Sequence, residues 1–295
     1  MQGRLFLSRF EGVSMYKTGL VLEGGGLRSI FTSGVLDAFM ENDIKLPYVI
    51  GVSAGSCNGV SYIAKNYHRM KDITLCYCND ERYMGIKSMI KNGEYLNSRW
   101  IFGELSYDLF PLDYDEFEKS GAVFCVVVTN ALTGKAEYFY PTEFRDNCDE
   151  IKASCALPLA TKPVKLGKDY YYDGGLVDSI PLERAYDDGC EKAVVILTQD
   201  RSYIKHPIGH KRAVKKVMKK YPLVAEKILE RHNMYNKQRE FVFEQEKAGR
   251  AFVICPEAPL ETSTLNNDKL KLSEIYHMGY RQGLENIDAV KEYLK

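Results

Sequence analysis

Residues 21–39 of this 295-residue chain read VLEGGGLRSIFTSGVLDAF, with three consecutive glycines between an apolar run and a helical pattern. Residues 18–23 (TGLVLE), which lead into the glycines, form a short apolar strand candidate. After the glycines, apolar side chains recur at the spacing of one helix face, at Leu27, Ile30, Phe31, Val35, Ala38 and Phe39. The stretch therefore predicts a strand, a tight loop and a helix in direct succession.

A second strand and helix follow in the same order. Residues 48–53 (YVIGVS) predict a strand, and residues 54–65 (AGSCNGVSYIAK) predict a helix built from small residues. Two successive strand-turn-helix units indicate parallel strands joined by crossover helices, which is an α/β sheet. More strands are expected at residues 122–130, at a hairpin with its turn at Thr133-Gly134, at 170–175 and at 192–199.

The character of the sequence changes after residue 200. Residues 201–221 contain eight Lys and Arg and no Asp or Glu, and long helical patterns continue to about residue 246. A further strand is expected at 251–256, and one or two helices at 268–294. We expect a mainly helical extension packed on the main domain. Within it, an amphipathic helix face is predicted from the spacing of Val214, Val217, Met218 and Tyr221.

Two regions leave alternatives open. The aromatic-rich residues 67–120 favour core packing over a lid or an acyl pocket. The lysine-rich face of residues 201–221 favours a solvated surface, with peripheral contact to an anionic membrane as the alternative. Vesicle binding would separate these two hypotheses for the lysines.

The overall composition limits the partners and the compartment. Lys and Arg total 40, as do Asp and Glu, so net charge gives no reason to expect a nucleic-acid partner. Eight cysteines without zinc-site spacing indicate no metal site and a reduced, cytoplasmic protein. No apolar run is long enough to cross a bilayer. The apolar patch near the N-terminus is too short for a signal peptide, and residues 1–15 are expected to lie outside the fold.

The sequence Gly51-Val52-Ser53-Ala54-Gly55 fits the G-x-S-x-G pattern between a predicted strand and a predicted helix. A serine on so sharp a turn needs flanking glycines, because side chains there would collide. The following helix directs its amides and its positive end toward the serine oxygen. In this context Ser53 is a candidate nucleophile rather than an ordinary turn residue.

Gly24, Gly25 and Gly26 are candidates for the oxyanion hole that such a nucleophile requires. Without Cβ atoms, successive amides can turn toward one point, and the helix after them adds its dipole. A phosphate-binding loop is excluded because no Gly-Lys-Ser/Thr follows the glycines. A dinucleotide fingerprint fails at its last position, which is Ser29.

The candidate base is Asp173 rather than a histidine. None of His68, His206, His210, His232 and His277 follows a predicted strand as a catalytic triad would require. Asp173 ends the predicted strand at 170–175 beside two glycines. A carboxylate acts as a base here only if it is partly desolvated and bonded directly to the serine hydroxyl.

Three motifs in order, EGGGLRS (23–29), GVSAG (51–55) and DGG (173–175), resemble the patatin-like phospholipases, which are acyl hydrolases with a Ser-Asp dyad and no catalytic histidine. The similarity extends to VVVTNALTGKAEYF (126–139) and ASCALPLATKPVKLGKDYYYDGGLVDSIPLERA (153–185), and covers about residues 18–200. It implies a three-layer α/β sandwich with a mostly parallel central sheet at residues 16–200. Residues 201–295 resemble the helical C-terminal extension of a bacterial cytosolic branch.

Carried onto this chain, the resemblance makes Ser53 the nucleophile and Asp173 the base, with the three glycines as the oxyanion loop. It places Arg28 at the family's basic position, with Gly51, Gly55 and Gly174 in supporting positions. The implied activity is hydrolysis of lipid carboxylic esters through an acyl-Ser53 intermediate, without cofactor or metal.

Two residues depart from the family pattern. Glu23 stands where many members have Asp, and Ser29 replaces the glycine that closes the loop. If the closing position needs a positive φ, Ser29 is strained. A damaged oxyanion loop would leave a catalytically impaired binding or regulatory protein, which is the alternative function.

Overall fold

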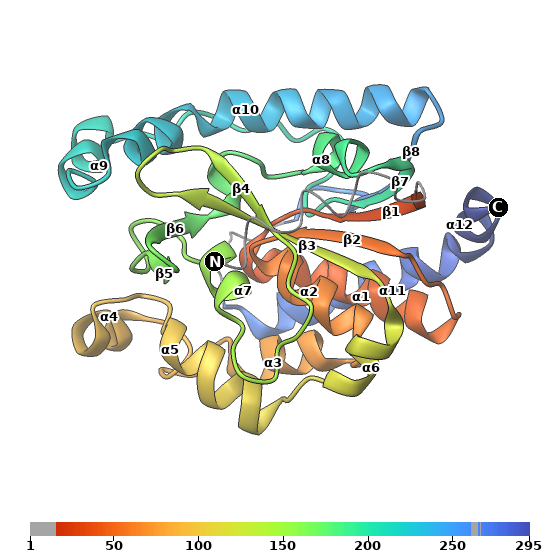
Figure 1. Cartoon of the computed structure of the whole chain (residues 1–295), viewed down its shortest axis with the longest axis horizontal. Coiled ribbons are helices and arrows are strands. Elements are labelled where there is room, and N and C mark those ends of the chain that lie inside the picture. Colours follow the sequence, from red (N-terminus) through yellow and green to blue (C-terminus); the bar gives the residue numbers. More distant parts are fainter. Residues whose placement is uncertain (1–15, 261–264, 266) are drawn as a thin grey trace.

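A twisted central sheet with helices on both faces organises the protein (Figure 1). The computed structural model describes residues 16–260, 265 and 267–295. The predicted N-terminal extension, residues 1–15, lies outside the described residues. The described strands are β1 (Tyr16–Leu22), β2 (Tyr48–Val52), β3 (Val123–Asn130), β4 (Ala136–Phe139), β5 (Val164–Leu166), β6 (Asp169–Asp173), β7 (Cys190–Ile196) and β8 (Ala251–Ile254).

The sheet is mostly parallel, as predicted. Its order is β5-β6-β3-β2-β1-β7-β8, and β4 pairs with β3 outside this path. The strands β1, β2, β3, β7 and β8 pair in parallel. The three strands at the other end, β4, β5 and β6, pair antiparallel with their neighbours. The predicted fold class is therefore confirmed, and the predicted hairpin is β3-β4.

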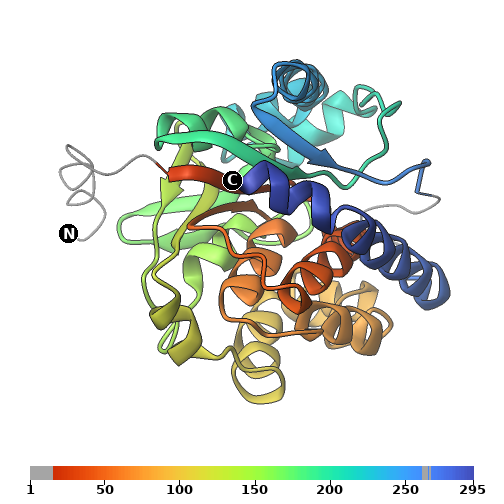
Figure 2. The ribbon, with the colours of Figure 1, turned by 90° about the vertical axis from the view of Figure 1, so that its right-hand side faces the viewer.

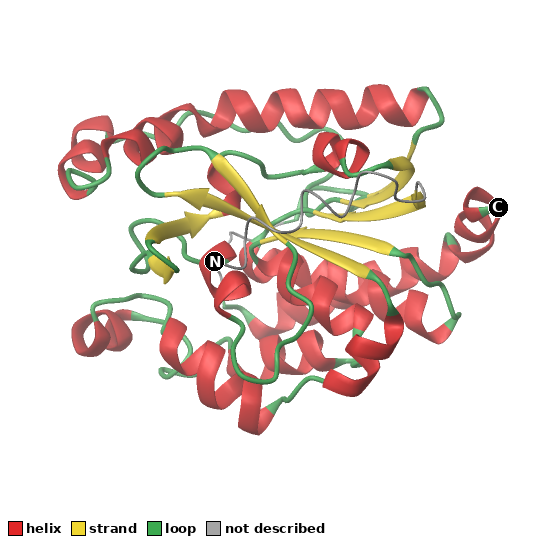
Figure 3. Ribbon diagram, in the orientation of Figure 1, coloured by secondary structure: helices red, strands yellow, loops and turns green. Residues whose placement is uncertain are grey.

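Alternate side chains of β1 enter two separate cores, one on each face of the sheet. Leu20 and Leu22 pack into the larger core with α1 and α2, whereas Val21 packs into the opposite core with residues of α8 and α10. Figures 1 and 3 show these helix layers on either side of the strands. The helices that define the layers are α1 (Ile30–Glu41), α2 (Ala54–Ile63), α7 (Asp149–Ser154), α8 (Leu182–Asp187) and α10 (Pro222–Lys247).

The helix α1 is buried on all sides, although its sequence predicts a single apolar face. Every residue from Ile30 to Phe39 is buried, because α11 (Lys269–Glu285) covers the side that faces away from the sheet (Figure 2). Glycines permit the contact: a Cβ on Gly34 would lie 2.3 Å from the carbonyl oxygen of Tyr276, and one on Gly279 would lie 2.1 Å from that of Phe31. The C-terminal region is thus packed directly on the first helix.

Residues after 200 also extend the sheet. The helix α10 packs on the face of the sheet opposite α1, and the strand β8 that follows it pairs with β7. The chain ends with α11 and α12 (Ile287–Leu294). The predicted amphipathic helix is shorter than expected, because α9 spans only Lys211–Val217. Val214, Met218 and Tyr221 are buried against Tyr172, as predicted. Val217 is 66% exposed, so its assignment to the buried face was wrong; the helix ends at this residue.

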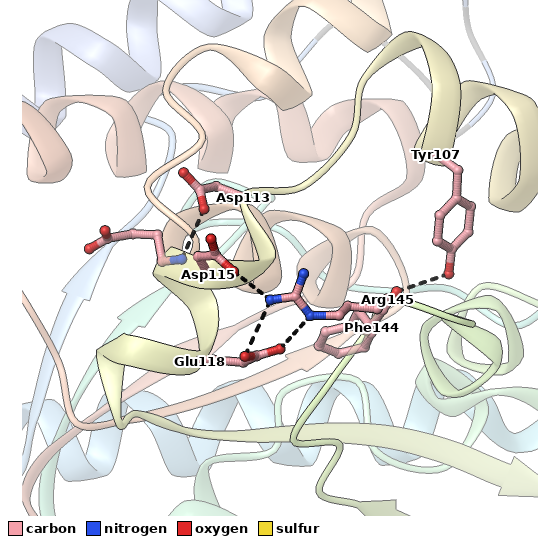
Figure 4. A network of polar contacts seen from close by, with 7 residues as sticks. Tyr107, Asp113, Asp115, Glu118, Phe144 and Arg145 are labelled. Atoms are coloured by element: carbon pink, nitrogen blue, oxygen red, sulfur yellow. Dashed lines mark hydrogen bonds and ion pairs between the residues drawn. The ribbon is translucent and has the colours of Figure 1, made fainter.

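The aromatic-rich region forms short helices below the sheet. These are α3 (Arg69–Tyr77), α4 (Ile86–Asn92), α5 (Ser98–Trp100), the kinked π-helix η3 (Ile101–Leu109) and α6 (Tyr114–Ser120). Polar contacts fix the last two helices to the chain before α7 (Figure 4). The guanidinium of Arg145 pairs with Asp115 and Glu118, and the Tyr107 hydroxyl donates to the carbonyl oxygen of Phe144 over 3.2 Å.

Candidate active site

Ser53 lies on a strained turn between β2 and α2. Its backbone has φ 54° and ψ −128°, a conformation that costs a non-glycine residue roughly 1–3 kcal/mol. The flanking glycines permit this turn by close approach: a Cβ on Gly51 would lie 2.7 Å from the Gly55 carbonyl oxygen, and one on Gly55 would lie 2.5 Å from that of Leu22. The predicted serine elbow is therefore present, and its side chain is half-buried.

A second serine, which the sequence analysis did not single out, supports the elbow. The backbone amide of Ser53 donates to Ser154 Oγ over 2.8 Å, and Ser154 Oγ donates in turn to the carbonyl oxygen of Val127 over 2.6 Å. Because Ser154 is fully buried in α7, these bonds join α7 and β3 to the elbow. They also occupy the Ser53 amide, which already donates to Ser154 Oγ.

Asp173 is the last residue of β6, and the order of the strands in the sheet brings it close to Ser53. It pairs with Val128 of β3, and the neighbouring Val127 pairs with Val52 of β2, directly before Ser53. A Cβ on Gly174 would lie 2.3 Å from the Val127 carbonyl oxygen, so the chain after Asp173 passes against β3. The sheet therefore brings together the two residues predicted as nucleophile and base.

Burial raises the pKa of the Asp173 carboxyl above its ordinary value of 3.8. The positive charge of Arg231, a hydrogen bond with the Ser53 side chain and the amide of Gly175 oppose this increase. The Gly175 amide donates to Asp173 Oδ1 over 2.8 Å. A desolvated carboxyl beside a serine side chain is compatible with a general base.

The glycine loop lies beside the elbow. A Cβ on Gly24 would lie 3.2 Å from Ser53 Cβ, and one on Gly25 would lie 2.8 Å from Thr198 Oγ1. Gly26 has φ 57°, which favours glycine, and begins the 3₁₀ helix η2 (Gly26–Ser29). Among the described residues, the backbone amides of these three glycines donate no backbone hydrogen bond in the turns, loops and helix caps. Their donors are compatible with an oxyanion hole.

The backbone of Ser29 is not strained, although strain was expected if the position that usually holds glycine needed a positive φ. Its backbone has φ −66° and ψ −1°, an ordinary helical conformation. Its hydroxyl donates to the carbonyl oxygen of Gly26 over 2.7 Å. The positive φ falls on Gly26 instead, so a serine at the closing position supports the loop rather than distorting it.

Glu23, which stands where many family members have Asp, takes part in a buried hydrogen-bond network. Its carboxylate accepts hydrogen bonds from the Thr198 amide over 2.6 Å and from the Tyr235 hydroxyl over 2.5 Å. Tyr235 belongs to α10, which also provides Arg231; the Arg231 Nε donates to the Gly175 carbonyl oxygen over 2.6 Å. Sequence analysis missed both α10 residues, because nothing near them in the chain indicates a site.

The residues predicted for the active site line one cavity of about 160 Å³. Its lining includes Ser53, Asp173, the three loop glycines and Arg28. Among the described residues, no histidine is part of this lining. Its apolar wall contains Ile101, Phe102, Leu105 and Tyr83 from the aromatic-rich region. Tyr83 and Phe102 also pack against the larger core, as expected, so this part of the region lies between the core and the cavity. Tyr77, in contrast, packs on Trp100 and Phe110 outside this lining.

Within the described ranges, no group of three or more His, Cys, Asp or Glu side chains is placed to hold a metal ion. No described helix is both long enough and apolar enough to span a bilayer. The cytoplasmic location stays a prediction.

A serine elbow at the carboxyl end of an inner strand of a mostly parallel sheet, beside a glycine loop and a buried carboxyl, defines an α/β protein of the G-x-S-x-G class. A model of the patatin-like phospholipase family matches residues 20–186, which is more than half of the chain. The chain therefore belongs to the patatin-like phospholipase family. A second family model, described as a domain of unknown function (DUF6363), matches residues 221–295.

Three relatives extend this comparison. The uncharacterized protein YjjU of Escherichia coli is 28% identical over 271 residues, covering 89% of this chain and 75% of the relative. A probable lipid hydrolase, 463L of Invertebrate iridescent virus 6, is 26% identical over 58% of this chain and 63% of its own length. Lysophospholipase NTE1 of Saccharomyces cerevisiae is 26% identical over 63% of this chain, which spans only 11% of the yeast protein. The family and the two relatives named as hydrolases support lipid hydrolase activity.

Proposed function

We propose that the protein is a serine acyl hydrolase that cleaves carboxylic esters of lipids. The observation that best supports this proposal is the shared cavity, which is lined by the strained Ser53, the buried Asp173 and the glycine loop. Asp173 accepts the Ser53 proton while the hydroxyl oxygen attacks the ester carbonyl. The amides of Gly24, Gly25 and Gly26 stabilise the oxyanion.

The alcohol leaves with a proton returned by Asp173, and the acyl group remains bonded to Ser53. A water molecule then gives its proton to Asp173 and attacks the acyl carbonyl, which releases the fatty acid and restores the serine. Every step uses groups of this chain and water.

A fluorophosphonate probe tests this proposal, because only an activated serine forms the covalent adduct. We expect mass spectrometry to find the adduct at Ser53, and Ser53→Ala to remove both labelling and hydrolysis of a p-nitrophenyl ester. Asp173→Asn should lower both strongly. The control Ser120→Ala removes an exposed serine outside the cavity and should label normally. Turnover by Ser53→Ala at the wild-type rate would contradict the proposal.

The alternative, an impaired binding or regulatory protein, depended on strain at Ser29. That serine has ordinary helical backbone angles, so the structure provides no support for this alternative. Absence of labelling in folded wild-type protein would nevertheless favour it.

We also propose peripheral contact with an anionic membrane. Figure 1 shows α4 and α9 at the same end of the molecule. On α4, Ile86 is 74% exposed and Ile90 is 81% exposed, and exposed lysines accompany them on both helices. Exposed apolar side chains beside lysines suit the surface of a bilayer that contains anionic lipid.

Vesicle co-sedimentation tests this contact. Binding to vesicles that contain phosphatidylglycerol should exceed binding to pure phosphatidylcholine vesicles and should decrease with added salt. Replacing Ile86 and Ile90 together by Ser should weaken it, whereas the control Leu284→Ser, on α11, should not. Equal binding to both vesicle types, or none, would contradict the proposal.

A further inference from the structure

Two cysteine side chains meet in the wall of the candidate active-site cavity. Cys57 lies on α2, one turn after Ser53, and Cys155 directly follows α7. Their sulfur atoms lie 3.7 Å apart, which is hydrogen-bond distance for two thiols. Both side chains are half-buried and line the cavity, so a small solute in the cavity can reach them. Within the described part of the chain, this is the only hydrogen-bonded pair of thiols.

The segment that contains Cys155 holds both residues of the candidate dyad. Ser154, directly before it, accepts the hydrogen bond from the Ser53 amide. The carbonyl oxygen of Ala156, directly after it, accepts a hydrogen bond from the Asp173 amide over 2.9 Å. A displacement of this segment therefore acts on Ser53 and on Asp173, each through a single hydrogen bond.

A buried guanidinium lies near the other cysteine. Arg69 of α3 lines the same cavity. Its Nε donates to the carbonyl oxygen of Phe110 over 2.8 Å, and its Nη1 donates to Ser61 Oγ over 3.0 Å. Ser61 Oγ in turn donates to the carbonyl oxygen of Cys57 over 2.9 Å, which fixes Arg69 relative to this cysteine. Both acceptors of the guanidinium are neutral, and its positive charge favours a thiolate at Cys57.

The two thiols differ in acidity. The hydrogen bond with Cys155 and the positive charge of Arg69 lower the pKa of the Cys57 thiol below its ordinary value of 9.0, although burial and the negative charge of Asp173 oppose them. The hydrogen bond with Cys57 and burial raise the pKa of the Cys155 thiol. Cys57 is therefore the stronger nucleophile, and Cys155 keeps its proton and donates it to the hydrogen bond. A reactive cysteine beside a second thiol is the arrangement found in redox-sensing pairs.

We propose that Cys57 and Cys155 form a peroxide-sensitive modification site, at which a reversible disulfide slows the candidate enzyme. The effect on activity rests on the proposed hydrolase function, whereas formation of the disulfide does not. The two sulfur atoms must approach from 3.7 Å to a bond length of about 2.0 Å. This approach displaces the segments that hold Ser53 and Asp173, and small displacements of reacting groups lower a rate strongly.

The reaction consumes two thiols and one molecule of hydrogen peroxide. The Cys57 thiolate attacks one peroxide oxygen and the O–O bond breaks, which leaves a sulfenic acid on Cys57 and a hydroxide that takes up the thiol proton as water. The Cys155 sulfur then attacks the Cys57 sulfur. The S–O bond breaks, and the departing hydroxide takes the Cys155 proton and leaves as a second water. Two electrons have passed from the two sulfurs to the peroxide.

Peptide mapping without reduction tests whether this disulfide forms. Trypsin places the two cysteines in separate peptides, residues 46–65 and 153–165, each with one cysteine. The full-length wild-type protein is treated with hydrogen peroxide, and its remaining thiols are alkylated. We expect mass spectrometry to find the two peptides joined, at the sum of their masses less two hydrogens, and dithiothreitol to separate them.

The effect on activity is measured with the same samples. Oxidation should lower kcat/KM for a p-nitrophenyl ester by about 10- to 100-fold, and dithiothreitol should restore it. Each variant is compared with its own untreated activity, because both cysteines line the cavity. Peroxide should leave the activity of Cys57→Ser unchanged on this scale.

Two further variants separate the steps. Cys155→Ser lacks the second thiol, so it should give no joined peptides and should leave a sulfenic acid on Cys57 that dimedone labels. The control Cys76→Ser removes an exposed cysteine outside the cavity lining. It should form the joined peptides and lose activity as the wild type does.

Three results would overturn the proposal. The first is peroxide-treated wild type in which residues 46–65 and 153–165 are not joined. The second is full formation of the disulfide without loss of activity. The third is an equal loss of activity in Cys57→Ser and in the wild type, since oxidation elsewhere would then explain the effect.

The hydrolase proposal can fail separately. If fluorophosphonate did not label Ser53 in the reduced protein while the joined peptides still formed, the hydrolase function would fail and the modification site would stand. The two failures are therefore distinguishable.

Discussion

The hydroxyl of Tyr235 donates a hydrogen bond of 2.5 Å to the carboxylate of Glu23, residues separated by 212 positions in the chain. Both groups are buried, and Glu23 directly precedes the glycine loop. This bond ties α10, in the region that matches the domain of unknown function, to the loop that would stabilise the oxyanion. The two regions that match different family models therefore share one site.

Tyr235→Phe should destabilise the fold and lower activity, because it leaves one oxygen of a buried carboxylate without a donor. Loss of such a bond to a charged group costs about 1–3 kcal/mol. Urea unfolding should report this decrease in the free energy of unfolding. The control Tyr203→Phe removes a hydroxyl from the ring that packs on Tyr235, 6.0 Å away between centroids, and should change stability little. Equal effects of the two substitutions would contradict the assignment.

The activity should depend on pH through Asp173. A base must be ionised, so hydrolysis should be lost as pH falls through the raised pKa of Asp173, at a higher pH than for an ordinary carboxyl. Arg231→Gln removes a charge that lowers this pKa and should move the acid limb of the kcat/KM profile to still higher pH.

Arg231→Lys keeps the charge and should leave that limb nearer its wild-type position. Lys237→Gln serves as a control, because it removes an exposed cation from the same helix outside the cavity. An acid limb that does not move in Arg231→Gln would show that Arg231 does not act on Asp173 through its charge.

Ser29→Gly should not improve the enzyme, although it restores the residue usual in the family. The native φ of −66° needs no glycine, and the substitution removes the hydrogen bond from Ser29 Oγ to the Gly26 carbonyl oxygen. We expect Ser29→Gly and Ser29→Ala to lose about 0.5–1.5 kcal/mol of stability. Ester hydrolysis several-fold faster in Ser29→Gly than in wild type would show that serine does impair the loop.

Gly279→Ala should weaken the contact between α11 and α1. The added methyl group would lie 2.1 Å from the Phe31 carbonyl oxygen, so the helices must separate. Overpacking of this kind costs about 1–3 kcal/mol. As a control, Gly209→Ala adds a methyl group where no atom lies within 4 Å. Thermal unfolding should show a lower midpoint for Gly279→Ala alone, and an unchanged midpoint would refute this account of the packing.

Local sequence was sufficient to predict the elements that contain the candidate dyad. The G-x-S-x-G pattern at Ser53 and the strand that ends at Asp173 are short-range signals, since turn geometry and strand alternation depend on near neighbours. The parallel pairing of β1 with β2 also followed from two successive strand-helix units, whereas the order of the strands did not. The short strand β5 was not singled out, because three residues provide too little periodicity.

Only the tertiary structure showed which distant residues complete the site. Ser154, Arg231 and Tyr235 lie far from the motifs in sequence, and their spacing resembles that of ordinary helix and loop residues. The same applies to Ser29, whose backbone angles depend on how Gly26 turns. By itself, the sequence determined the family, the candidate nucleophile and the candidate base. The electrostatic environment of the cavity was decided by packing α10 against the sheet, because charges and hydrogen bonds act through space and not along the chain.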